Sequence, residues 1–291
     1  MAVREPICAG RFYDGSAATC RRHAEQLLQA EPLTDLPSPL YGGIVPHAGW
    51  VFSGALAART LRALADEADG PPETVVLFGA DHTGMVRAGE VWDQGAWRTP
   101  LCDAAIDEEL AAALLAADGG LRANPQAHLR EHSIEVQVPL LQTAAPRAKI
   151  VPIAVPPTPQ AVEIGRTVGR TLAVRFGRAR VVGSTDLTHH GGHFPAPGGR
   201  GEQSERYARQ NDRRMLDRIE ALDAEGVIQE AAARQNACGA GAVAAAIAAC
   251  KELGATRGLT LDYTNSYEVT HRLQPEMADD TTVGYAAVVF A

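Results

Sequence analysis

Short apolar runs alternate with longer segments of helical periodicity along this chain, and this alternation constrains its fold more than any other feature. The runs at 43–45, 74–78 and 180–182 are predicted to be buried strands, each followed by a loop. Because strands that alternate with helices build sheets covered on both faces, we predict an α/β fold with a mostly parallel or mixed central sheet. The remaining strands are expected at 149–155, 259–263 and 283–290.

The helical segments complete this pattern and give no sign of a second domain. Ser53 is predicted to cap the helix that carries Leu56 and Leu64, because a serine oxygen accepts from free backbone N–H groups at a helix start. Further helices are expected at 17–30, 107–117, 131–144, 160–174, 205–222, 224–234 and 240–253. No internal repeat, linker or sharp change of composition divides the chain, so a single domain over residues 1–291 is the simpler prediction.

Composition and charge exclude several classes of protein. The chain has 27 Lys and Arg residues against 35 Asp and Glu, a net charge of −8, and no basic cluster in its sequence, which argues against a nucleic-acid partner. No window reaches the ~18 to 20 apolar residues of a membrane span, and the N-terminus lacks the apolar core of a secretory signal. The five cysteines form no C-x-x-C motif, so we expect free thiols in a reducing cytoplasm.

Each of three predicted strands ends in a loop that carries histidine. His47 follows the first strand and His82 the second, and the third opens into a loop with Asp186, His189 and His190. Ligands bind at the carboxyl ends of strands in such folds, and converging imidazole nitrogens are a usual way to hold Zn or Fe. A single histidine after a strand is more often a hydrogen-bonded structural group. The alternative is therefore a polar rim that happens to be rich in histidine.

A second candidate lies in EHSIE, residues 131–135. Glu131 and Glu135 are spaced i, i+4, and His128 and His132 form a His-x-x-x-His pair that could bind a metal. The alternative is a solvated helix start, where early carboxylates favour the helix dipole. The spacing alone does not decide between these two interpretations.

Cys238 differs from the other four cysteines because it lies at a predicted helix start, in QNACGAGAV. Asn236 is a possible cap, and the helix is expected to begin near Ala240. A helix N-terminus favours the thiolate, which is the form that binds metals or attacks substrates. The alternative is a small buried residue, which is the interpretation we prefer for Cys250 on the same helix. Neither a G-x-S-x-G motif nor a phosphate-binding P-loop is present.

Five ordered motifs together resemble the Memo family, whose bacterial and archaeal members are often called AmmeMemoRadiSam system protein B. They are PHAGWVFSG at 46–54, EHSIEVQVPLL at 131–141, STDLTHHG at 184–191, ACG at 237–239 and the C-terminal VGYAAV. The opening AGRFYDGS at 9–16 is similar to the N-terminal segment of the family. The resemblance implies a fold similar to that of the LigB-type class III extradiol dioxygenases, which bind non-haem Fe(II) through two histidines and a glutamate.

The resemblance also implies a ligand set for this chain. His47 and His82 match the two histidine ligands, and Cys238 matches the cysteine that the Memo pattern has in the third place. Asp186 and His189 match further pocket residues of the family, and His132 belongs to its EHSIE signature. A site with two histidines and a cysteine is softer than one with a carboxylate, so Cu or Zn would suit it besides Fe(II).

Three functional hypotheses follow from the resemblance. In the first, the chain is a metal-dependent oxidoreductase or dioxygenase-like enzyme in which His189, oriented by Asp186, acts as the general base. In the second, the same pocket binds a metal or small ligand without turnover and acts through partners. A weaker third is zinc-dependent hydrolysis. The associated AMMECR-type and radical-SAM domains are not in this chain, so any coupling to them would occur in trans.

Overall fold

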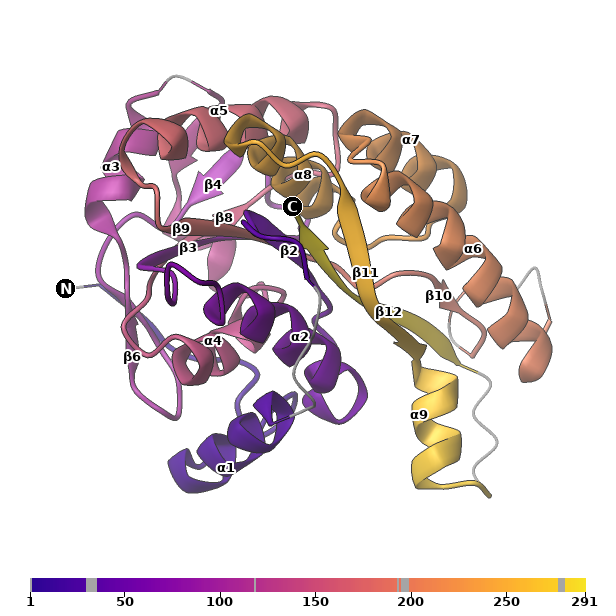
Figure 1. The fold of residues 1–291 in the computed structure, drawn as a ribbon. Helices are drawn as coiled ribbons and strands as arrows, with labels where there is room; N and C mark the ends of the chain where they lie inside the picture. The colour runs from indigo at the N-terminus through magenta and orange to yellow at the C-terminus, as the bar shows by residue number, and fades with distance from the viewer. Residues whose placement is uncertain (1, 30–35, 118, 193, 195–198, 277–280) are drawn as a thin grey trace.

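The structure is a computed structural model that describes residues 2–29, 36–117, 119–192, 194, 199–276 and 281–291. Within these residues nine strands form one mixed sheet, in the spatial order β10 (His189–His190), β12 (Thr282–Phe290), β2 (Gly42–Val45), β9 (Ala179–Ser184), β3 (Thr74–Gly79), β8 (Lys149–Ala154), β4 (Gly89–Val91) and β7 (Leu121–Ala123), with β11 (Gly258–Asn265) paired to β12 (Figure 1).

The four central strands β2, β9, β3 and β8 are parallel, and antiparallel neighbours flank them at β12 and β4. All residues of β2, β3 and β9 are buried, as expected for parallel strands that carry helices on both faces. The mixed α/β sheet predicted from the sequence is therefore confirmed. Because the central strands run in one direction, the loops that follow β2, β3 and β9 lie at the same edge of the sheet.

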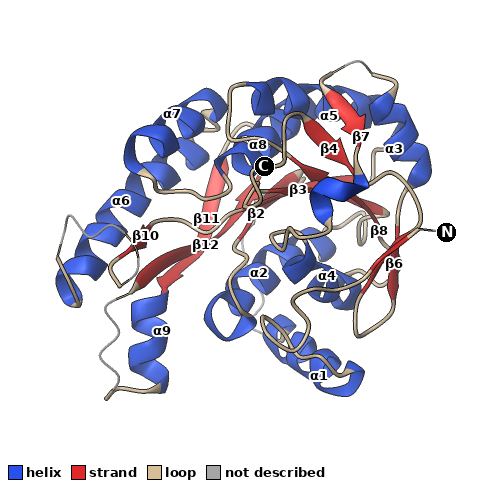
Figure 2. Ribbon diagram, turned by 180° about the vertical axis from the view of Figure 1, so that it is seen from behind, coloured by secondary structure: helices blue, strands red, loops and turns tan. Residues whose placement is uncertain are grey.

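Helices cover both faces of this sheet (Figures 1 and 2). One layer contains α3 (Glu108–Leu115), α5 (Gln160–Arg175), α6 (Glu202–Glu220), α7 (Ala224–Arg234) and α8 (Ala240–Leu253), and the other contains α1 (Ala17–Leu28), α2 (Trp50–Ala65) and α4 (Val138–Ala144). A last helix, α9 (Ser266–Leu273), follows β11. Ala30, the expected end of the first helix, lies outside the described residues. None of the described helices has the length and apolar character needed to cross a membrane.

The alanine-rich helix α8 packs unusually closely against its neighbours. A Cβ atom on Gly165 of α5 would lie 2.2 Å from the carbonyl oxygen of Ala245 in α8, so only glycine allows the two helices to approach this far. At the start of α8, a Cβ atom on Gly239 would lie 2.1 Å from the carbonyl oxygen of Ser184. Gly239 therefore lets the N-terminus of α8 sit directly on the end of β9, which places Cys238 at the carboxyl edge of the sheet.

A small three-stranded sheet holds the N-terminal segment beside the main sheet. It contains β1 (Val3–Arg4), β5 (Ala96–Arg98) and β6 (Asp103–Ala105), with β1 parallel to β5 and β5 antiparallel to β6. These strands, like β4 and β7, have only two or three residues, which is too short for an alternating pattern to show in the sequence. These short strands were therefore not predicted from the sequence.

The helix α2 begins earlier than predicted, so Ser53 is not its cap. Its N-cap residue is Gly49, and the Ser53 hydroxyl, inside the helix, donates to the carbonyl oxygen of Ala48 at 3.1 Å. The start is fixed by Trp50, whose backbone N–H donates to the carbonyl of Phe12 at 2.7 Å and whose indole N–H donates to Val136 at 3.0 Å. Contacts distant in sequence therefore decide where this helix starts.

Candidate metal centre

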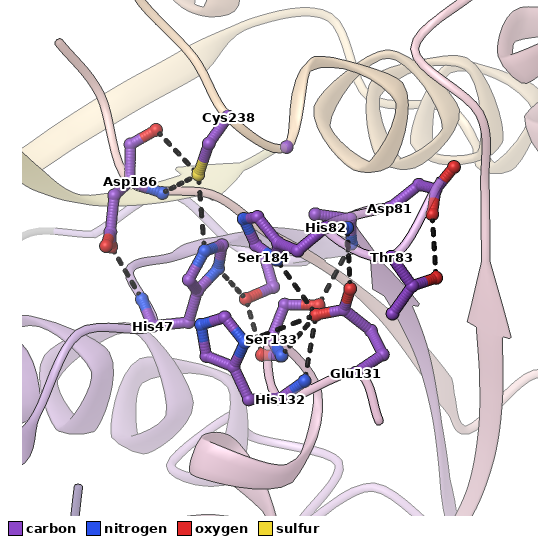
Figure 3. Close-up of polar contacts among 12 residues, drawn as sticks. His47, Asp81, His82, Thr83, Glu131, His132, Ser133, Ser184, Asp186 and Cys238 are labelled. Atoms are coloured by element: carbon purple, nitrogen blue, oxygen red, sulfur yellow. Dashed lines mark hydrogen bonds and ion pairs between the residues drawn. The ribbon is translucent and has the colours of Figure 1, made fainter. Parts of the chain in front are cut away.

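The structure brings two histidines and a cysteine together at the carboxyl edge of the central strands (Figure 3). His47 follows β2, His82 lies in the loop after β3, and Cys238 precedes α8. One ligand atom of each lies within 4.8 Å of the others, and the Cys238 Sγ lies 3.2 Å from His47 Nε2. A tetrahedral metal with bonds of about 2.0–2.3 Å separates its ligand atoms by roughly 3.3–3.8 Å. The three side chains therefore fit a metal ion with small adjustments.

His47 is held in the tautomer that a metal ligand requires. The Ser184 hydroxyl donates to the carbonyl of Ser133 at 2.8 Å, so its oxygen is left to accept from His47 Nδ1–H at 2.9 Å. With the proton on Nδ1, the lone pair of Nε2 points toward Cys238. Burial and the nearby His82 hold the pKa of His47 well below its usual range, which favours the neutral imidazole.

His82 is oriented by Glu131, a carboxylate that is only 1% exposed. Glu131 Oε1 lies 3.0 Å from His82 Nδ1, and Oε2 accepts the backbone N–H of His82 at 2.7 Å. Burial alone would lower the pKa of His82, but hydrogen bonds to Cys238 and Glu131 raise it to about 10. A carboxylate behind a ligating histidine fixes the ring and makes it a stronger donor. The His82 side chain is 32% exposed, so the site opens to solvent on this side.

The segment that carries Glu131 is not helical, in contrast to the prediction for 131–144. It becomes a short 3-10 helix, η2 (Glu135–Gln137), only before α4 begins at Val138. The reason is Glu131 itself, whose Oε1 accepts the backbone N–H groups of His132 and Ser133, both at 2.9 Å. A side chain that binds its own following backbone competes with helix formation. Both glutamates of EHSIE are buried, so the interpretation as a solvated helix start is also wrong.

Glu135 ties the N-terminal segment to the site. Its carboxylate forms a fully buried ion pair with Arg4 at 2.7 Å and accepts from the Cys8 backbone N–H at 2.7 Å and the Tyr13 hydroxyl at 2.9 Å. Arg4 also donates to the carbonyl of Glu131 at 2.7 Å and lies over the Trp97 ring, 4.2 Å from its centroid. The backbone position of Glu131 therefore depends on the first residues of the chain.

His132 lies at the site, whereas His128 does not. The ring of His132 stacks on His82 at a centroid distance of 4.7 Å and meets His47 edge-on at 5.4 Å. His128 is fully buried, and its Nε2 donates to the carbonyl of Glu90 at 2.8 Å. The proposed His-x-x-x-His metal pair is therefore wrong. His132 instead belongs to a second group, with His82 and Glu131, whose ligand atoms lie within 4.8 Å of one another.

The surroundings of Cys238 differ from the prediction in two respects. The N-cap of α8 is Gly239, because Asn236 is buried and donates its side-chain amide to the carbonyl of Asn211 at 2.9 Å. Burial, with a contribution from Asp186, raises the pKa of the Cys238 thiol, although a hydrogen bond to His82 opposes this. The helix N-terminus alone therefore does not produce a thiolate here, and a bound cation would be needed to favour it.

Asp186 and His189 lie in the loop after β9 but do not form the predicted pair. Asp186 Oδ1 accepts the backbone N–H of His47 at 2.7 Å, and burial raises the pKa of Asp186 to about 7. His189 Nδ1 donates instead to the carbonyl of Leu187 at 3.0 Å, which leaves Nε2 as an acceptor. Burial lowers the pKa of His189, so its ring is neutral near pH 7. His190 points elsewhere, with Nδ1 2.5 Å from the Ser204 hydroxyl.

The comparisons with known proteins agree with the motifs. The family described as Memo-like protein matches residues 4–289. The chain belongs to the Memo family. Among Memo relatives, a MEMO1 family protein of Methanopyrus kandleri is 38% identical over 299 residues, covering 99% of this chain and 98% of the relative. Another, of Methanothermobacter thermautotrophicus, is 36% identical over 279 residues, which cover 92% of this chain and 95% of the relative. The crystal structure of an uncharacterized protein from Escherichia coli K12 aligns with 78% of this Memo chain. The alignment covers 91% of the Escherichia coli chain, with 14% sequence identity and a TM-score of 0.47.

Proposed function

We propose that this Memo protein binds a transition metal through His47, His82 and Cys238, with Fe(II) as the first candidate and Cu or Zn as alternatives. The observation that supports this most strongly is the convergence of the three ligand atoms within 4.8 Å, from three separate parts of the chain. Two imidazoles and a sulfur form a donor set that suits all three metals. A site with three protein ligands keeps a position open, which is typical of catalytic rather than structural metal centres.

We propose further that the site is that of a metal-dependent oxidoreductase, dioxygenase-like in its use of O₂. The metal would supply Lewis acidity and redox chemistry toward a small molecule. His189 would accept a proton at Nε2, because its Nδ1–H is held by the Leu187 carbonyl rather than by Asp186. His132, stacked on His82, would contact the small molecule at the exposed side of the site. Asp186 would act on the position of His47 through the backbone.

The setting of the protein follows from the same proposal. The five cysteines are free thiols, which supports a reducing cytoplasm as its location. The family resemblance supports AMMECR-type and radical-SAM proteins as partners in trans.

Metal analysis of protein purified without oxygen tests the ligand assignment. We expect near-stoichiometric iron, copper or zinc in the native chain and loss of most of it in His47→Ala, His82→Ala and Cys238→Ser. Cys102→Ser is the matched control, because Cys102 is exposed and lies outside the cluster. Unchanged metal content in all three ligand variants would overturn the proposal.

Oxygen uptake by the metal-loaded protein tests the catalytic part separately. With a panel of catechols, we expect uptake that depends on the loaded metal and falls in His189→Gln, a variant that keeps the metal. Absence of uptake from a fully loaded sample would contradict the enzymatic proposal and favour metal binding without turnover.

A further inference from the structure

A cavity lies at the edge of the sheet opposite to the metal centre, where β3, β8 and β9 begin. It has a volume of about 970 Å³. Its walls are the segments 71–74, 145–149 and 175–179, which lead into these three strands, together with Asp107 and Glu109 at the start of α3. None of these residues belongs to the metal cluster. We call this cavity the basic pocket, because of the cations that line it.

Three cations of the basic pocket have no side-chain partner among the described residues. Arg147, Lys149 and Arg175 are exposed, and within the described part of the chain no side-chain hydrogen bond or ion pair engages them. A fourth cation, Arg178, is engaged, because it donates to Glu73 at 2.9 Å and to the carbonyl of Pro71 at 2.8 Å. In a chain of net charge −8, three free cations around one cavity are a local excess of positive charge.

The acidic residues of the basic pocket compensate this excess only in part. Asp107 is occupied by the protein, because it caps α3 through the Leu110 backbone N–H at 3.2 Å and accepts from the Thr74 hydroxyl. Glu73 is occupied by Arg178. Neither Asp107 nor Glu109 has a cation partner among the described residues, so three unpaired cations face two carboxylates, and the lining carries a net positive charge. Their charges are better satisfied by an anion from solution.

We propose that the basic pocket binds a small multiply charged oxyanion, a phosphate ester or a polycarboxylate, independently of the metal centre. Arg147 and Arg175 can each bind two oxygens of such a group, and Lys149 adds a third positive charge. The lining also contains apolar surface from Pro72, Pro146 and Phe176, against which the uncharged part of an organic anion can pack. The volume is that of a small-molecule site.

A purely structural role for the same cations makes a different prediction. Arg175 lies in the last turn of α5, and Arg147 follows the end of α4, where positive charge favours a helix dipole. In that case their removal would lower the stability of the protein and would change no ligand affinity. Binding and stability therefore have to be measured on the same variants.

Calorimetric titration of the full chain with pyrophosphate and with citrate tests the proposal. We expect saturable binding at millimolar concentrations or below for at least one anion, which identifies the preferred class, and no such signal from sodium chloride at equal ionic strength. The triple variant Arg147→Gln, Lys149→Gln, Arg175→Gln should bind at least about tenfold more weakly. The variant Arg170→Gln, Arg214→Gln, Arg272→Gln removes the same net charge from exposed positions outside the pocket and should bind as the native chain does.

Three outcomes decide against the proposal. Absence of saturable binding of both anions to the native chain would overturn it, and so would an equal loss of affinity in the two triple variants. Because phosphates also bind metals, His47→Ala serves as a separate control. Binding that survives in His47→Ala supports the basic pocket, whereas binding that disappears there belongs to the metal centre and contradicts the proposal.

Discussion

The two edges of the central sheet hold their polar side chains in different ways. At the carboxyl edge, His47, Glu131 and Ser184 are almost fully buried, and each makes at least one hydrogen bond at 3.0 Å or less. At the amino edge, Arg147 and Lys149 are exposed around an open cavity and have no such partners in the described chain. A buried polar group must be satisfied by the protein, whereas an exposed one is satisfied by water or a ligand.

This difference bears on function as well as on stability. At the carboxyl edge the side chains are fixed before any ligand arrives, which suits a metal that requires defined ligand positions. At the amino edge the side chains can adapt to anions of different shape. Substitutions at the carboxyl edge should therefore have large effects, and substitutions at the amino edge small ones unless an anion is bound.

The largest effect is expected from Glu135→Ala, behind the carboxyl edge. It leaves Arg4 buried without its ion-pair partner and should lower the free energy of unfolding by about 3–5 kcal/mol, measured by urea denaturation. Glu163→Ala is the control, because it removes an exposed pair with Arg166 and should cost no more than about 1 kcal/mol. Equal effects of the two variants would show that burial does not distinguish these pairs.

The next effect concerns metal affinity. Glu131→Gln keeps the shape of the side chain but weakens the interaction that orients His82, so metal affinity should fall by about 10–100-fold. Competition with a chelator of known affinity measures this, and an unfolding curve shows whether the variant remains folded. A folded variant with native metal affinity would show that Glu131 does not contribute to metal binding.

A graded change of the same metal affinity is expected from pH. The pKa of His82 is raised to about 10, so below that pH a proton occupies the ring and must leave when a metal binds. Apparent metal affinity should therefore rise with pH, by about tenfold per unit for each proton released. Chelator competition at several pH values from about 6 to about 9 measures how apparent metal affinity changes with pH. A flat profile would mean that no proton leaves the ligands.

The smallest effect is expected at the amino edge in the absence of a ligand. The triple variant Arg147→Gln, Lys149→Gln, Arg175→Gln removes only exposed charges, so its free energy of unfolding should differ from the native value by less than about 1 kcal/mol. A loss as large as that of Glu135→Ala would mean that these cations are structural, and would remove the contrast between the two edges.

The features that could be predicted from the sequence are those that depend on residues close together in the chain. The apolar runs located the central strands, and the order of the loops placed His47 and His82 at one edge, because parallel strands end together. Cys238 follows no strand, and only the resemblance to the Memo family assigned it to the same site. The Memo family was predicted from the five motifs and is confirmed. The metal roles of these three residues stay a prediction.

The features that the sequence did not reveal depend on contacts between distant residues. Arg4 meets Glu135 across 131 positions, and no local pattern indicates that pair. For Glu131 a signal existed, since it precedes a histidine in a motif of the family. Its role behind His82 was missed because residues 131–144 were predicted to be helical, and in a helix Glu131 could not accept three backbone N–H groups. The basic pocket was missed because its cations come from two segments, 147–149 and 175–178, that are distant in sequence and meet only at the amino edge of the sheet.

The central claim is that Cys238 and the two histidines bind one metal ion, and the spectrum of the cobalt(II)-loaded protein tests it most directly. A sulfur ligand gives cobalt(II) a thiolate-to-metal charge-transfer band. We predict this band in the native chain and in Cys102→Ser, and its loss in Cys238→Ser together with a fall in cobalt affinity. A loaded native protein without the band, or a band that persists in Cys238→Ser, would contradict the account.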